Sequence, residues 1–206
     1  MQFEKIIQGS FNQSHLSFGT SAGKQCACCS LFSICFNKIR SPGYWNTEDL
    51  DFLVREGDNL YKSLRKDTYL MVPDLPQYVP MFESLVSVRY LENKFGFNSY
   101  SPISFLKPQN ESSAYDGAIF FIKGLCISLI YQKRAIYLFD SHSRNNCGQP
   151  IPNGFSALIK FKRTKDVEQF IVSTYLNQSD YQVQYEMQFL IIENFRELAF
   201  PKISRA

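Results

Sequence analysis

The sequence predicts an α+β domain in which a central helix packs against a curled antiparallel sheet. Helix-like segments fill the first third of the chain, whereas short apolar segments separated by turn residues dominate the second half. Aromatic residues make up 16% of the chain and charged residues 20%, which is typical of a well-packed globular protein. A chain of 206 residues is long enough to bury a sizeable core. We therefore expect residues 1–206 to form a single domain.

The first expected helix begins at or near Cys26 and continues to about Arg40. The segment CACCSLFSICFNKIR is mostly apolar, and the breaker Ser-Pro-Gly at 41–43 follows it. Cys26 is therefore expected at the amino end of a central, largely buried helix.

A second helix is expected from Asn46 or Thr47 to about Lys66. Either residue can cap its amino end, and acidic residues in its first turns suit the helix dipole. Leucine, valine and tyrosine side chains at helical spacing give it one apolar face. Gly57 is expected to be its weak point.

The remainder of the chain is expected to supply the sheet. Residues 92–116 are rich in Asn, Ser, Pro and Gly and are expected to form a long connection. Beyond them we expect an antiparallel meander with turns at Gly124 and at 132–134. The expected elements are strands over 69–72 and 85–90 with a loop or single turn over 73–80 between them, strands over 118–122, 125–131 and 135–139, a polar loop over 143–154, a strand over 155–161, a helix over 164–176 and a strand over 181–192.

Composition and charge exclude several classes of protein. The net charge of +3 is too small to indicate a nucleic-acid partner. No apolar segment approaches the roughly 18 residues that span a bilayer, so no membrane association is expected. The amino-terminal sequence lacks the pattern of a signal peptide. We expect a reducing, cytoplasmic setting, in the producing cell or in an infected host; the sequence does not indicate an oligomeric state.

The six cysteines match no usual zinc-site spacing, and neither a metal nor another cofactor is expected. The adjacent pair Cys28-Cys29 argues against a disulfide framework. Cys28, Cys29, Cys35 and Cys126 are interpreted as small apolar packing residues, whereas Cys147 lies in a polar loop and is expected to be exposed.

Three residues could form the reactive centre of a cysteine protease. The thiolate of Cys26 is the nucleophilic form, and the amino end of a helix favours it. Of the two histidines in the chain, His142 follows a predicted strand and could accept the thiol proton. If that segment stays extended, Asp140 and His142 point to the same face, and the carboxylate can hold the imidazole tautomer.

Gln13 is the candidate for the oxyanion hole. Its side-chain amide and the backbone N–H of Cys26 could bind a developing oxyanion, and small residues at 19, 22 and 23 allow the chain to turn tightly between them. Each residue alone has an ordinary explanation, as a loop or core histidine, a D-x-H pair without function, or a glutamine in a polar loop. The combination indicates the protease site.

Two motifs resemble a known family. QxxxxxGxxAGxQC (residues 13–26) and YLFDSHSR (residues 137–144) resemble the deubiquitinase domain at the start of herpesvirus large tegument proteins, and more closely its cellular and bacterial relatives. The resemblance extends from about Gln13 to Leu176 and is weakest over residues 41–115.

The resemblance implies a papain-like cysteine protease fold and hydrolysis of isopeptide or peptide bonds at the ubiquitin C-terminus through a thioester. It implies that Cys26 is the nucleophile, His142 the general base, Asp140 the orienting carboxylate and Gln13 the oxyanion donor. Gln25, the residue before the nucleophile, is expected to be structural. Ubiquitin or polyubiquitin chains are the implied partners, and residues 41–115 are the implied, more variable ubiquitin-binding region.

The two glycines that end ubiquitin suit a narrow cleft, which Tyr44 or Trp45 could wall, although packing is the simpler explanation of both residues. Ubiquitin's tail also carries arginines, so acidic contacts are expected. The candidates are Asp49, Asp51, Glu56 and Asp58, although such a charge cluster usually forms the solvated face of a helix. Two alternatives remain: a protease for another ubiquitin-like modifier, and a ubiquitin-binding module without turnover.

Overall fold

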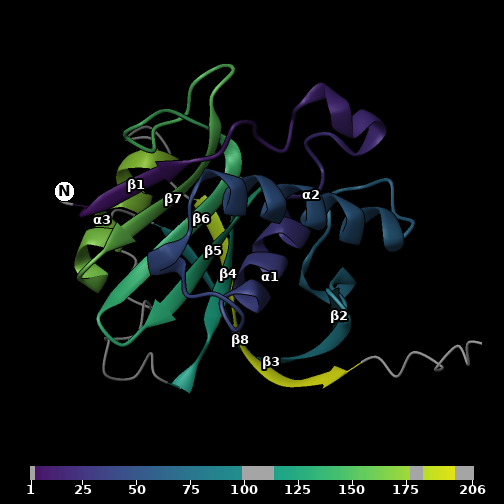
Figure 1. The fold of residues 1–206 in the computed structure, drawn as a ribbon. Coiled ribbons are helices and arrows are strands. Elements are labelled where there is room, and N and C mark those ends of the chain that lie inside the picture. The colour runs from purple at the N-terminus through teal and green to yellow at the C-terminus, as the bar shows by residue number, and fades with distance from the viewer. Residues whose placement is uncertain (1–2, 99–113, 177–182, 198–206) are drawn as a thin grey trace, which may run out of the picture.

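An antiparallel sheet forms the centre of the molecule (Figure 1). The computed structural model describes residues 3–98, 114–176 and 183–197. The strands are β1 (Lys5–Gln8), β2 (Tyr78–Met81), β3 (Ser84–Asn98), β4 (Gly117–Ile122), β5 (Leu125–Gln132), β6 (Ala135–Arg144), β7 (Phe155–Phe161) and β8 (Val183–Glu197). Within the described ranges the sheet has eight strands in the order β1-β7-β6-β5-β4-β8-β3-β2, and every neighbouring pair is antiparallel.

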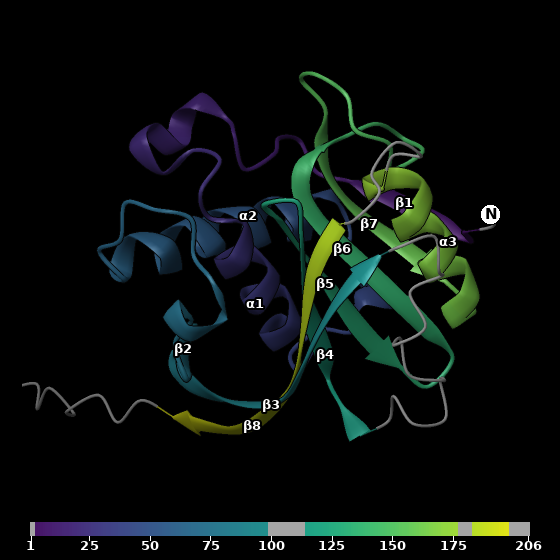
Figure 2. The same ribbon diagram turned by 180° about the vertical axis from the view of Figure 1, so that it is seen from behind.

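Helices cover both faces of this sheet (Figures 1 and 2). Helices α1 (Cys26–Phe36) and α2 (Thr47–Ser63) pack on one face, and α3 (Thr164–Tyr175) packs on the other. Because successive side chains of a strand point to opposite faces, β6 contributes Tyr137 and Phe139 to the core under α1, and Ile136 and Leu138 to the core under α3. The α+β prediction is confirmed, and no helix within the described ranges is both long and apolar enough to cross a membrane.

Helix α1 is the central element. All eleven of its residues are buried, as its apolar sequence predicted, and it begins at Cys26. It ends at Phe36, four residues before the expected end at Arg40. The residues at 38–40 are exposed, so the chain leaves the sheet where its apolar sequence gives way to polar side chains.

The predicted cap of α2 is present. The Asn46 side chain accepts a hydrogen bond from the Asp49 backbone N–H at 3.0 Å, and the Asp49 carboxylate accepts one from the Asn46 N–H at 2.8 Å. This reciprocal pair satisfies two N–H groups that a helix start otherwise leaves without partners. The helix ends at Ser63 rather than at Lys66, and Arg65 adopts a positive φ of 52° just beyond it.

Gly57 has a packing role that its sequence position did not reveal. It lies where α2 crosses α1, and a Cβ at this position would lie 2.5 Å from the Sγ and 2.6 Å from the Cα of Cys29. The glycine therefore allows the two helices to approach closely.

Gly57→Ala is accordingly expected to lower the free energy of unfolding by about 1–3 kcal/mol, because overpacking outweighs the better helix propensity of alanine. Urea denaturation measures the effect, with Asn59→Ala as the control at an exposed position of the same helix. A Gly57→Ala protein more stable than wild type would contradict the close helix contact.

Three expectations about the sheet were wrong. Residues 69–72 form no strand; the last of them, Val72, begins a short 3-10 helix, Val72–Asp74. The expected loop over 73–80 contains most of β2. Residues 92–98, expected in a long connection, belong to β3, which pairs with β8 along its length. Residues 99–113 of that connection and residues 181–182 lie outside the described ranges.

Candidate active site

Cys26 occupies the first position of α1, and its side chain is buried. The residue before it, Gln25, is fully buried and holds this end of the helix in place. Its Nε2 donates to the backbone carbonyl of Gln13 at 2.8 Å, and its Oε1 accepts from the Lys24 N–H at 2.9 Å. The backbone N–H groups in the first turn of α1 have no carbonyl within the helix to receive them. The thiol therefore lies beside N–H donors at the positive end of the helix dipole.

His142 lies near the end of β6, where the strand pairing with β7 is irregular. Asp140 pairs with Ala157 and Arg144 with Phe155, so the register advances by four residues along β6 and by only two along β7. This mismatch is a bulge in β6. The Asp140 Oδ1 spans this bulge by accepting from the backbone N–H of His142 at 2.8 Å and contacting its Nδ1 at 2.6 Å. The carboxylate thereby fixes both the backbone and the ring of His142. The regular extended strand expected between Asp140 and His142 is interrupted by the bulge.

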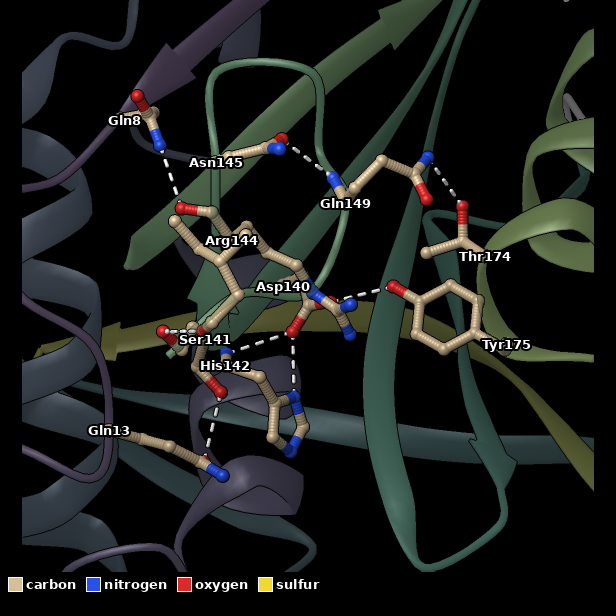
Figure 3. A network of polar contacts seen from close by, with 12 residues as sticks. Gln8, Gln13, Asp140, Ser141, His142, Arg144, Asn145, Gln149, Thr174 and Tyr175 are labelled. Atoms are coloured by element: carbon tan, nitrogen blue, oxygen red, sulfur yellow. Dashed lines mark hydrogen bonds and ion pairs between the residues drawn. The ribbon is translucent and has the colours of Figure 1, made fainter. Parts of the chain in front are cut away.

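The second carboxylate oxygen of Asp140 is also occupied (Figure 3). Its Oδ2 accepts from Arg144 Nε and from the Tyr175 hydroxyl, each at 2.6 Å. The Arg144 guanidinium also stacks on the Tyr175 ring, with 4.8 Å from its central carbon to the ring centroid. Burial alone would raise the pKa of Asp140, but Arg144 first, and then His142 and Tyr175, hold it well below its usual range. The carboxylate is therefore a fixed negative charge behind the imidazole.

The thiol of Cys26 interacts with both His142 and Cys126. A hydrogen bond with the Cys126 thiol lowers the pKa of Cys26 most; burial opposes this, and the hydrogen bond and charge of His142 lower it further, to well below its usual range. Burial and the neighbouring Cys26 raise the pKa of Cys126, which therefore stays protonated; its Sγ also donates to the Ser30 hydroxyl at 3.6 Å. Burial disfavours the imidazolium, but Asp140 and Cys26 outweigh it and raise the pKa of His142 to about 9. The lowered pKa of Cys26 and the raised pKa of His142 thus favour a thiolate–imidazolium pair.

Gln13 is 1% exposed, and its backbone is tied to both sides of the site. Its N–H donates to the Ser141 carbonyl at 2.8 Å, and its own carbonyl accepts from Gly23 N–H at 3.1 Å and from Gln25. The Ser141 hydroxyl donates to the side-chain Oε1 of Gln13 at 3.0 Å (Figure 3). With the oxygen occupied, the amide nitrogen is the group free to donate toward a ligand.

Residues 8–196 match the model of the herpesvirus tegument protein N-terminal conserved region. The chain belongs to this family. The resemblance predicted from the two motifs is confirmed. A comparison with curated proteins found no match.

The fold of this tegument-family chain is similar to a crystal structure from murine cytomegalovirus. That structure is the ubiquitin-specific protease encoded by a viral tegument protein, in complex with a ubiquitin-based suicide substrate. The TM-score is 0.75 at 15% sequence identity, and the match covers 98% of this chain and 90% of that chain. At this identity the comparison establishes a shared fold.

Several residues considered in the sequence analysis lie apart from this centre. His15 is exposed and stays near the rings of Phe11 and Phe18, with its Nδ1 2.7 Å from the Ser17 hydroxyl. Trp45 is 2% exposed, packs on Phe36 and donates from its Nε1 to the Arg40 carbonyl at 2.8 Å. Packing therefore explains Trp45. It does not explain Tyr44, which is 76% exposed.

The acidic residues proposed to contact a basic substrate have internal partners. Asp51 accepts from the Ser10 N–H, buried Asp58 contacts Ser21 and Lys62, and Asp49 belongs to the cap of α2. Glu56 is half-buried and accepts from Asn59. Asp51 and Asp58 are buried, so the expected solvated helix face is wrong for these two residues. Asp49 is engaged in the cap of α2 instead.

Three members of the site were not predicted from the sequence. Arg144 lies within the second motif, but its contact with Asp140 depends on the bulge in β6, which no local signal announces. Tyr175 comes from the end of α3 and reaches Asp140 because that carboxylate continues the face of β6 that α3 covers. Cys126 was interpreted as packing, yet its thiol meets Cys26; the remaining predicted packing cysteines are buried and Cys147 is exposed.

The thiolate–imidazolium pair predicts an unusual pH dependence of alkylation. Iodoacetamide should modify Cys26 at about pH 6.5 almost as fast as at pH 8, whereas a thiol of ordinary pKa slows roughly tenfold per pH unit below about 8. The reason is that a lowered thiol pKa keeps the thiolate at acid pH, and His142 stays charged up to about pH 9. Peptide mass spectrometry measures the rate at Cys26, with glutathione as the reference thiol. A loss of about thirtyfold between pH 8 and pH 6.5, matching that of glutathione, would contradict the pair.

Proposed function

We propose that this chain is a cysteine deubiquitinase that hydrolyses isopeptide or peptide bonds at the ubiquitin C-terminus. The observation that carries the proposal is the position of Cys26 at the buried start of α1, where the neighbouring Cys126 and His142 lower the pKa of its thiol. His142 is in turn held by the ionised Asp140 at 2.6 Å. Family membership and the murine cytomegalovirus protease of similar fold, which was crystallised with a ubiquitin-based suicide substrate, support ubiquitin as the substrate.

In the proposed reaction the Cys26 thiolate attacks the carbonyl carbon of the scissile bond. The carbonyl oxygen becomes an oxyanion, which the Gln13 amide and the Cys26 backbone N–H stabilise. As the C–N bond breaks, His142 donates its proton to the leaving amine, and ubiquitin remains on Cys26 as a thioester. His142, now neutral, takes a proton from water, whose oxygen attacks the thioester and releases the ubiquitin carboxylate. Asp140 keeps the imidazole oriented and stabilises its charged form throughout.

The same proposal extends to the architecture. A papain-like arrangement is supported by the nucleophile at the start of a buried helix and the histidine on the facing sheet. We propose that residues 1–206 act as one catalytic domain, that residues 41–115 contribute to ubiquitin binding, and that the protein works in an intracellular setting.

A ubiquitin-propargyl probe tests the function directly, because its alkyne forms a covalent bond with a catalytic thiol. We expect a mass increase of one ubiquitin on a denaturing gel. Labelling by another ubiquitin-like probe in place of ubiquitin would identify a protease for that modifier. Binding of ubiquitin without labelling would instead indicate a binding module without turnover, which the complete Cys26–His142–Asp140 arrangement disfavours.

Gln13→Ala is expected to lower kcat by roughly 10²–10³, the usual effect of removing one oxyanion donor. The backbone bonds of Gln13 do not involve its side chain, so the position of Cys26 is expected to survive the change. Hydrolysis of a fluorogenic ubiquitin amide measures kcat. His15→Ala is the matched control, since this exposed residue lies two positions away and is expected to be neutral. A Gln13→Ala protein with full kcat would remove this residue from the oxyanion hole.

A further inference from the structure

Two hollows flank the Cys26–His142 pair. The first, of about 480 Å³, is lined by Cys26 and Cys126 together with parts of segments 69–71, 121–124 and 183–186. The second, of about 550 Å³, is lined by His142, Ser14, Leu125 and the segment 150–152, and it reaches the end of α3. The thiol thus borders one hollow and the imidazole borders the other.

The chemistry of the proposed function, on which this inference rests, assigns a different substrate part to each hollow. The acyl carbon becomes bonded to the Cys26 sulfur, so the chain that carries it lies on the thiol side. The leaving nitrogen receives its proton from His142, so the group attached to that nitrogen lies on the imidazole side. We propose that the hollow beside His142 is the leaving-group subsite, that it takes the aliphatic stem of the lysine whose isopeptide bond is cut, and that Ile151 is its main apolar contact.

The loop that carries Ile151 is held rigidly in place. The Ser143 hydroxyl donates to the Ile151 carbonyl at 2.7 Å, and the Ile151 N–H donates to the Ser143 carbonyl at 3.3 Å. The Asn145 Oδ1 accepts from the N–H groups of Cys147 and Gln149, at 2.8 and 3.0 Å. Gln149 Nε2 ties the loop to the Thr174 hydroxyl of α3 at 3.2 Å.

This preorganisation presents an apolar side chain to solvent. Ile151 is 38% exposed and lies between Pro150 and Pro152, which restrict the backbone further. A rigid loop that exposes an isoleucine beside the proposed general acid can bind a ligand without a large cost for ordering.

The charges around the hollow favour a neutral alkyl chain. Among the described residues that line it, none carries a carboxylate. The guanidinium of Arg144 is turned toward Asp140 and Tyr175. A lysine in an isopeptide bond has no charge on its nitrogen, so its four methylenes suit this lining. The released lysine becomes an ammonium ion, for which these walls offer no counter-ion, and this favours its departure.

The test compares a reaction that has a leaving group with one that has none. The isopeptide substrate is ubiquitin joined to the lysine side chain of a fluorescent peptide, and the ubiquitin-propargyl probe reports the acyl side alone. Ile151→Asp is expected to lower kcat/KM for the isopeptide roughly tenfold, as loss of an apolar subsite contact does, with the rate of probe labelling unchanged. Ile151→Leu should restore cleavage. Ile39→Asp is the matched control, because Ile39 is 45% exposed and lies beyond the other end of α1.

Equal losses in cleavage and labelling, or no loss in either, would overturn the subsite while leaving the deubiquitinase proposal intact. A wild-type protein that fails to react with the probe would overturn the proposed function and the subsite together. The two failures are therefore distinguishable in one set of measurements.

Discussion

Cys26→Ala is expected to abolish hydrolysis of ubiquitin conjugates while ubiquitin binding persists. No thioester can form without the sulfur, so the proposed reaction has no first step. The fold should tolerate the change, since the side chain loses one heavy atom at the border of a hollow and α1 keeps its buried apolar contacts. Release of a fluorogenic amide from ubiquitin measures turnover, and calorimetry with ubiquitin measures binding.

Cys147→Ala is the control for this experiment, because Cys147 is the exposed thiol among the cysteines and is expected to be dispensable. Labelling by the ubiquitin probe should follow the same pattern, with a mass shift in the control and none in Cys26→Ala. Turnover or labelling retained by Cys26→Ala would reject this residue as the nucleophile.

The parts of the fold that sequence reasoning predicted correctly depend on local signals. The cap at Asn46 and the tight turn at Lys123-Gly124, where φ is 51° and 75°, are set by a few neighbouring residues. The errors occurred where distant segments decide the structure. β3 continues to Asn98 because β8, about a hundred residues later, pairs with it. The sequence of residues 92–98, which contains Asn and Gly, does not indicate this pairing. β1 was not foreseen for the same reason, since the strand with which it pairs, β7, lies far along the chain.

The candidate site likewise combines residues predicted from local motifs with residues that only long-range contacts bring in. Cys26, His142, Asp140 and Gln13 lie in two short motifs, and the structure brings them together. The groups that set their charge states come from elsewhere: Tyr175 from the end of α3 and Cys126 from β5. Gly57, expected to weaken α2, instead lets that helix approach α1. Whether a tyrosine serves an active site or only fills a core depends on which buried group its hydroxyl meets, and a single sequence does not contain that contact.

His142→Ala is expected to lower kcat by roughly 10⁴–10⁶, close to the effect of removing the nucleophile, because members of such a catalytic group act as a unit. Two losses coincide. The leaving amine has no proton donor, and the thiolate of Cys26 loses the imidazolium that lowers its pKa. Iodoacetamide alkylation of Cys26 at about pH 6.5 should therefore slow together with turnover, which a purely structural role of His142 would not require.

Free imidazole provides the positive test of this interpretation. His142 borders an open hollow of about 550 Å³, so removal of its side chain leaves a space that imidazole can enter from solvent. Asp140, held by Arg144 and Tyr175 at 2.6 Å, remains in place to orient the added ring. We expect imidazole to restore part of the turnover of His142→Ala and none of that of Cys26→Ala. If His142→Ala turns over at the wild-type rate without imidazole, the general base is another group; the exposed His15, which borders a separate hollow, is then the remaining histidine to test.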